Sequence, residues 1–332
     1  MFQIHFGAML KYINTDCCET HQNISVARDA NRIDIAIVTV LKNGDNYDNY
    51  KLAQDLFHCY AIYHNYSWLV IDVSSNKTLQ RLCPQNDYIK SEWILFIDAD
   101  MCVINPNHLI EEWIDDNYSI IFYLRTFNFE VAAGSYLVKN TPYSRKFLSH
   151  WANYEKNLPN SYHGSDNGAI HSVMMDMVQP EKLYEKKQCE KFWKEARYYW
   201  ISLWTYEACI QYLLGANKSW LRKVKILNKT KSWVRDVWLT NSVWSNEDFV
   251  LHGWQMRKLN KAIFAGWELP LTSDTVNLSS CSTDKAYINW AYKKCYMKSQ
   301  SEVQALLSKT IDSVDSEYEK TLNREVLRFL KK

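Results

Sequence analysis

Residues 93–106 read WILFIDADMCVINP. The apolar run Trp93–Ile97 leads directly into Asp98-Ala99-Asp100, and such a continuous run is typical of a strand buried on both faces of a parallel sheet. In extended backbone, side chains two residues apart point the same way, so Asp98 and Asp100 can converge on one cation just beyond the strand. Hard carboxylate oxygens favour Mn²⁺ or Mg²⁺ as that cation.

The position of this motif along the chain gives it meaning, because a bare Asp-x-Asp arises about once by chance in a chain of this composition. The run Ile33–Leu41 predicts an earlier buried strand, a four-residue apolar repeat to about His64 predicts a helix, and Trp68–Val73 predicts the next strand. Such a βαβ unit gathers ligands at the C-terminal ends of its strands. The acidic motif follows the third strand at that edge; the alternative is an incidental acidic loop.

The remaining chain continues the α/β pattern. It predicts strands at 119–123, 135–138, 223–227 and 249–252 and helices at 144–156, 167–177 and 191–214, with a charged helical tail over 285–332. We therefore expect a poorly specified N-terminal segment at 1–31, one catalytic domain at 32–272 and a helical C-terminal extension at 273–332.

The composition indicates which classes of binding partner and which cellular compartment to expect. The 39 basic and 37 acidic residues are dispersed along 332 residues and leave a formal charge of +2, which argues against a nucleic-acid partner. Nine cysteines lack the short paired spacings of a zinc site. Seven N-x-S/T sequons, against about three expected by chance, favour the Golgi or another secretory lumen over the cytoplasm. There we expect glycans and a disulfide, for instance between Cys281 and Cys295.

No apolar run has the length of a signal anchor. Membrane association is therefore expected only through an anchor that is not visible in this chain.

Several segments together resemble the GT-A galactosyl- and xylosyltransferase family. IAIVTVL (35–41), CYAIYHNY (59–66) and WILFIDADMCVINP follow that family's order. AAGSYLVKNTPYSRKFLSHW (132–151), HGSDNGAIHSVM (163–174) and FVLHGW (249–254) resemble its later strand and helix, its D-Q/N-x-A segment and its terminal histidine motif. The similarity covers about Ile33 to Leu271, and it is greatest to uncharacterised nucleotide-diphospho-sugar-transferase-like proteins. The chain departs from the family before the Asp-x-Asp strand, where only the short segment Cys83–Glu92 remains.

The resemblance implies a GT-A (Rossmann-like) α/β fold, with a mixed, mostly parallel sheet, helices on both faces and a helical C-terminal extension. It implies transfer of a hexose or pentose from a nucleotide-sugar, expected to be a UDP-sugar, to a glycan hydroxyl. The cofactor would be Mn²⁺ or Mg²⁺, and the anomeric configuration would be retained. The implied metal ligands are Asp98, Asp100 and His252. Thr39, Ala99 and Lys258 would meet the nucleotide and its diphosphate. Asp166 and Asn167 would act at the donor sugar as the catalytic pair, and the acceptor side would hold Glu130, Gly134, Ser135 and Trp254.

Each assignment has a structural alternative in the residues themselves. A lone histidine such as His252 is more often a core or surface residue, Lys258 fits a solvated helix face, and Thr39 fits ordinary β propensity. Asp166 or Ser165 could simply cap a helix.

Two rival functions also stand. The short Cys83–Glu92 segment suggests a non-catalytic nucleotide-sugar- or glycan-binding homologue. The second rival is a phosphatase that uses Asp98 as its nucleophile. Phosphatase motifs of that kind follow the first strand and are followed by Gly-Thr, whereas this motif is followed by Met101-Cys102.

Overall fold

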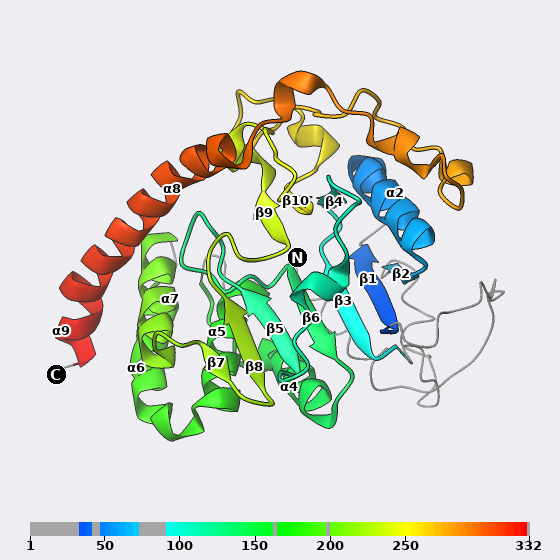
Figure 1. Ribbon diagram of the computed structural model, residues 1–332. Helices are drawn as coiled ribbons and strands as arrows, with labels where there is room; N and C mark the ends of the chain where they lie inside the picture. Colours follow the sequence, from blue (N-terminus) through cyan, green and yellow to red (C-terminus); the bar gives the residue numbers. More distant parts are fainter. Residues whose placement is uncertain (1–32, 42–46, 73–90, 162–164, 197–199, 331–332) are drawn as a thin grey trace. The chain divides into compact units, whose positions relative to one another are not determined.

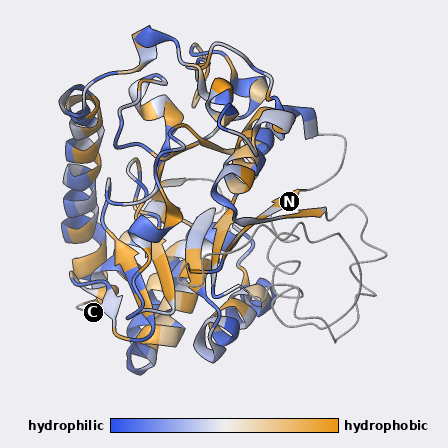
Figure 2. Ribbon diagram, turned by 45° about the vertical axis from the view of Figure 1, so that its right-hand side comes forward, coloured by the Kyte–Doolittle hydropathy of each residue, from blue (hydrophilic) through white to orange (hydrophobic). Residues whose placement is uncertain are grey.

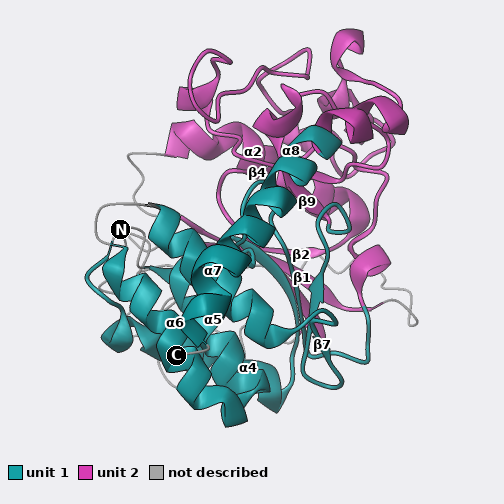
Figure 3. Ribbon diagram, turned by 90° about the vertical axis from the view of Figure 1, so that its left-hand side faces the viewer, with its two compact units in different colours: residues 1–10, 115–232, 308–332 teal, residues 11–114, 233–307 magenta. Residues whose placement is uncertain are grey.

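The structure is a computed structural model that describes residues 33–41, 47–72, 91–161, 165–196 and 200–330. The chain divides into two compact units (Figure 3). Among the described residues, unit 1 comprises Asp115–Ser232 and the chain from Ser308 onward, and unit 2 comprises the chain up to Ile114 together with Trp233–Leu307. The predicted segment 1–31 and most of the short segment Cys83–Glu92 lie outside the described residues.

Unit 2 contains the βαβ unit that the sequence predicts (Figure 1). Strand β1 (Ile35–Leu41) pairs in parallel with both β2 (Ser67–Asp72) and β3 (Trp93–Ile97). Helix α2 (Tyr47–His64) connects β1 to β2 and packs on β2. Every residue of β3 is buried, which explains its continuous apolar sequence. The C-terminal ends of the three strands share one edge, and Asp98 follows β3 there.

A second, smaller sheet in unit 2 receives the chain after Asp100. Its central strand is β10 (Val250–His252), which runs antiparallel to β4 (Met101–Val103) and parallel to β9 (Val234–Asp236). Strands of three residues carry no readable periodicity, so the sequence predicted only β10. This sheet places His252 opposite Met101 on one side and Asp236 on the other.

Between Asp115 and Ser232, the described part of unit 1 forms strands and four α-helices. Strand β5 (Ile120–Tyr123) pairs antiparallel with β6 (Ser135–Lys139) and parallel with β8 (Val224–Leu227), and β8 pairs antiparallel with β7 (Ser219–Trp220). Helix α5 (Asp166–Val178) packs against three other helices, which are α4 (Pro142–Asn153), α6 (Leu183–Glu195) and α7 (Trp200–Leu214). The single helix predicted over 191–214 is therefore wrong, because α6 ends at Glu195 and packs against α7.

Short 3₁₀ turns connect these elements. They are η2 (Ile110–Trp113), η3 (Tyr154–Asn157), η4 (Pro180–Lys182), η5 (Val237–Thr240), η6 (Met256–Lys258), η7 (Leu278–Ser280), η8 (Ala286–Trp290) and η9 (Lys294–Tyr296). Residues 285–299 thus form turns instead of the predicted helix.

The C-terminal helix begins at Gln300, as α8 (Gln300–Thr321), and continues through a π-helical turn, η10 (Leu322–Val326), into α9 (Leu327–Leu330). Most of its residues are hydrophilic (Figure 2). Most of them are also exposed. Within unit 1, Val314 and Tyr318 pack against Phe129, Trp204 and Ala208. The chain is therefore an α/β protein with mixed sheets and a C-terminal helix, as predicted. Within the described ranges, no helix combines the length and apolarity needed to cross a membrane.

Two disulfides lie within the described parts of the chain. Cys59 of α2 pairs with Cys281 in unit 2, and Cys189 of α6 pairs with Cys209 of α7 in unit 1. The predicted Cys281–Cys295 pair is wrong: Cys281 is buried against α2, whereas Cys295 is a free, exposed thiol.

Candidate functional site

The turn between β3 and β4 presents the two aspartates. The backbone N–H of Met101 donates to the Asp98 carbonyl at 3.2 Å, which closes the turn. The Asp100 carbonyl accepts from the N–H groups of Gly253 and Trp254 at 3.0 and 2.8 Å, so the turn is fastened to the segment after β10. The Gln54 side chain donates to the Ala99 carbonyl at 2.8 Å, which ties the centre of the motif to α2.

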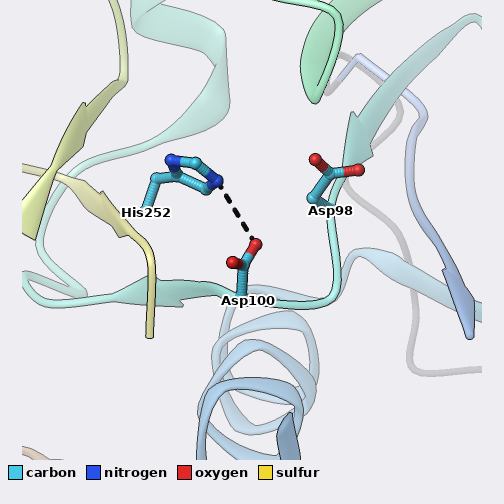
Figure 4. A group of neighbouring side chains, drawn as sticks. All are labelled: Asp98, Asp100 and His252. Atoms are coloured by element: carbon cyan, nitrogen blue, oxygen red, sulfur yellow. Dashed lines mark ion pairs between the residues drawn. The ribbon is translucent and has the colours of Figure 1, made fainter. Parts of the chain in front are cut away.

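Asp98, Asp100 and His252 face one another at this turn (Figure 4). One potential ligand atom from each residue lies within 4.8 Å of the other two. The His252 Nε2 is 3.4 Å from the Asp100 Oδ1. Two segments about 150 residues apart in sequence therefore bring together the three side chains that the resemblance implied as metal ligands.

Neighbouring side chains fix the orientation of two members of this group. The Gln255 side chain donates to the Asp100 Oδ2 at 2.6 Å, which leaves Oδ1 facing His252. The His252 Nδ1 donates to the Asp236 Oδ1 at 2.7 Å. Gly253 has a φ of +92°, a conformation in which glycine is favoured, and it turns the chain directly after His252. Sequence reasoning missed Gln255 and Asp236, since neither belongs to a motif.

The charges of the group stabilise one another. Burial alone would raise the pKa of Asp100, but the His252 charge, hydrogen bonds from His252 and Gln255, and the Lys258 charge together lower it to about 2. Burial would lower the pKa of His252, but Asp100 and Asp236 outweigh it and raise that pKa to about 10. At neutral pH the His252 imidazolium therefore lies between the Asp100 and Asp236 carboxylates. A divalent cation could replace the positive charge of this imidazolium.

The donor set fits a divalent metal. Two carboxylates and an imidazole are ligands that Mn²⁺ accepts readily and Mg²⁺ accepts in part. Two ligands at right angles on an ion with bonds of about 2.1 Å lie about 3 Å apart. The 3.4 Å between His252 and Asp100 is close to that spacing, and the 4.8 Å limit for the whole group requires only small side-chain movements.

The other predicted residues of unit 2 have different environments. Lys258 ends η6 and is close enough for its charge to lower the pKa of Asp100. Thr39 is completely buried within β1. Trp254 is also completely buried, with its ring centroid 4.4 Å from that of Trp267. It packs in the core of this loop and presents no exposed face on which a sugar could stack.

The remaining predicted residues lie in unit 1. Glu130 is nearly buried, and its carboxylate pairs with Arg125 at 3.0 Å. Gly134 and Ser135 lie at the start of β6, where Ser135 is completely buried. Asp166 and Asn167 begin α5, and the Ser165 side chain makes no capping hydrogen bond.

Asp166 and Glu207 are unusual acids in unit 1. Burial raises the pKa of Asp166, more than hydrogen bonds from Ser165 and backbone N–H groups lower it. Sequence reasoning missed Glu207 of α7, which is completely buried with no hydrogen-bond partner for either carboxyl oxygen. Burial, with a smaller contribution from Glu130, raises its pKa well above the usual value and so favours the neutral form of the Glu207 carboxyl.

Three solved structures resemble the chain distantly. One is a glycosyltransferase involved in the glycosylation of the major capsid of PBCV-1, with 11% identity and a TM-score of 0.36 over 66% of this chain and 93% of that one. The others are both of the glycosyltransferase GlyE of Streptococcus pneumoniae TIGR4. The apo form has 14% identity and a TM-score of 0.32 over 44% of each chain. The second has 13% identity and a TM-score of 0.30 over 48% of each chain.

The curated protein sequences contain no match to the chain. A family model does match it, over residues 57–266, which is more than half of its length and includes both aspartates and His252. The chain therefore belongs to the family described as protein of unknown function, DUF273.

Proposed function

We propose that this chain is a metal-dependent glycosyltransferase that uses a nucleoside diphosphate sugar. The observation that carries the proposal is the convergence of Asp98, Asp100 and His252 where β3 ends. Ligands of open α/β sheets bind at this edge, and two carboxylates beside an imidazole suit a cation that is also bound by phosphate oxygens.

Each residue of the group has a distinct part in this proposal. Asp98, Asp100 and His252 would hold Mn²⁺ or Mg²⁺, and Gln255 would keep the Asp100 carboxylate in place through its hydrogen bond. The bound cation supplies Lewis-acid stabilisation of the negative charge on a leaving nucleoside diphosphate. Lys258 adds a second positive charge near the same position and would attract the diphosphate.

The finer assignments rest on the family resemblance. We propose UDP as the nucleotide, Asp166 and Asn167 as ligands of the donor sugar, and Glu130, Gly134 and Ser135 as part of the acceptor side. Retention of configuration belongs to the same set, and NMR of the anomeric proton in the first product formed would test it.

We also propose a secretory-lumen location. The described residues contain two disulfides, and cytosolic proteins seldom keep such bonds. The five sequon asparagines that the structure describes are all exposed, as acceptors of glycans must be; they are Asn65, Asn117, Asn217, Asn228 and Asn277.

The experiment is the release of UDP from a panel of UDP-hexoses and UDP-pentoses, with Mn²⁺ and with a chelator. We expect hydrolysis of at least one donor only with metal, and loss of at least about 100-fold in Asp98→Asn and Asp100→Asn, because each substitution removes ligand charge. Asp284→Asn is the matched control, since Asp284 is an exposed aspartate of the same unit. Full activity in both site variants would refute the metal assignment. Metal-dependent UDP binding without hydrolysis of any donor would favour the non-catalytic binding protein.

A further inference from the structure

Asp236 ends the short strand β9, directly beside the candidate metal centre. The parallel pairing of β9 with β10 sets Asp236 level with His252. The Asp236 Oδ1 accepts a hydrogen bond from the His252 Nδ1 at 2.7 Å, and Asp236 is only 3% exposed. The second ring nitrogen, Nε2, faces the Asp100 carboxylate at 3.4 Å. The imidazole is thus held between two carboxylates, one on each nitrogen.

Arg235 directly precedes Asp236 in β9, but its guanidinium is not the partner of the Asp236 carboxylate. Successive side chains of a strand point to opposite faces. Arg235 is bound on its own side, where its Nη2 lies 2.8 Å from the Asp248 Oδ2 and 2.8 Å from the Val243 carbonyl. The Arg235 charge is therefore balanced by Asp248, and β9 contributes its guanidinium to one hydrogen-bond system and its carboxylate to another.

We propose that Asp236 is a positioning residue that orients His252 for metal binding, an inference that rests on the proposed function. Accepting the Nδ1 proton fixes the rotation of the ring and leaves Nε2 as the nitrogen that meets the metal. A carboxylate on the far nitrogen of a metal-bound imidazole also strengthens the ligand, and loss of such a partner weakens metal binding by about 10-fold to 100-fold. Asp236 itself does not touch the metal or the substrate.

Calorimetry with Mn²⁺ and UDP on the full chain tests this role in three variants. Asp236→Asn keeps the side-chain shape and an acceptor oxygen but removes the charge, and we expect the Mn²⁺ Kd to rise about 10-fold. Asp236→Leu removes the acceptor as well, and we expect a rise of about 100-fold. Asp248→Asn is the matched structural control: it breaks the buried pair with Arg235 and lowers the unfolding temperature, but it should leave the Kd of the folded protein unchanged.

Spin-echo spectroscopy of the bound Mn²⁺ adds a readout that stability alone does not move. The imidazole nitrogen should modulate the echo of the wild type and of Asp248→Asn, and this modulation should weaken in Asp236→Leu. An unchanged Kd and unchanged modulation in both Asp236 variants would overturn the positioning role.

The same data separate this inference from the proposed function. If His252→Ala weakens Mn²⁺ binding but the Asp236 variants do not, only the positioning role fails. If the wild type binds no Mn²⁺ with UDP, or binds it independently of Asp98 and Asp100, the metal centre itself fails and the role of Asp236 falls with it.

Discussion

His171 makes the stability of the protein depend on pH in a calculable way. It lies completely buried in α5, where its Nε2 accepts from the backbone N–H of Val131 at 3.1 Å and its Nδ1 donates to the Asn167 carbonyl at 2.9 Å. A backbone N–H can only donate, so Nε2 must carry a lone pair and the ring must be neutral. Burial is the main reason that its pKa falls from 6.5 to about 4, against smaller opposing effects of hydrogen bonding and Glu130.

The sign and size of the effect follow from linkage. Because the folded-state pKa is depressed, the unfolded chain binds the proton first, and stability is lost as pH falls below the unfolded value of 6.5. The full loss approaches about 3 kcal/mol near pH 4, and about 2 kcal/mol is already lost by about pH 5. His252 acts in the opposite direction in the metal-free protein, since its raised pKa makes its contribution greatest at low pH.

Comparison with His171→Gln isolates the contribution, because the glutamine does not titrate. Urea unfolding of both proteins, disulfides intact, at about pH 7.5 and about pH 5 gives the measurement. We expect the wild type to lose about 2 kcal/mol more than the variant between the two pH values. An equal loss in both proteins would refute the neutral, buried histidine.

Three further predictions concern packing and covalent structure. Gly168→Ala should destabilise unit 1 by about 1–2 kcal/mol in urea unfolding, because a Cβ would lie 2.5 Å from the buried Trp193 ring and overpacking outweighs the gain in helix propensity; an unchanged midpoint would contradict this. Glu207→Leu should stabilise the protein by about 1–3 kcal/mol, since it removes two buried oxygens without partners. Because the pKa of Glu207 is raised, this gain in stability should grow as the pH rises above the usual carboxyl range. A variant less stable than the wild type would contradict the prediction, because it would mean that the Glu207 carboxyl has a stabilising partner. Peptide mapping of unreduced, secreted protein should find the disulfide pairs Cys59–Cys281 and Cys189–Cys209. A Cys281–Cys295 link would contradict the structure.

The sequence was sufficient for the elements whose burial leaves a readable pattern. Strands β1 and β3 are continuous apolar runs because both faces are covered, and α2 repeats its apolar residues at helical spacing. Asp98 and Asp100 could be placed from strand geometry alone. His252 needed the family resemblance, because nothing local distinguishes it from a core histidine.

The parts that the sequence could not supply depend on long-range pairing. Asp236 gains its role only through the register of β9 with β10, and neither strand exceeds three residues. The partner of Cys281 lies 222 residues away, so sequence proximity wrongly favoured Cys295. Trp254 is an aromatic residue of a type that can stack on sugars, but its side chain is buried in contact with Trp267.

Anomalous diffraction from crystals grown with Mn²⁺ and UDP tests the central claim most directly. We predict one strong manganese peak about 2.0–2.3 Å from carboxylate oxygens of Asp98 and Asp100 and from the His252 Nε2. UDP phosphate oxygens should complete its coordination. A map with no peak at these three side chains, or with manganese bound elsewhere on the chain, would contradict the account.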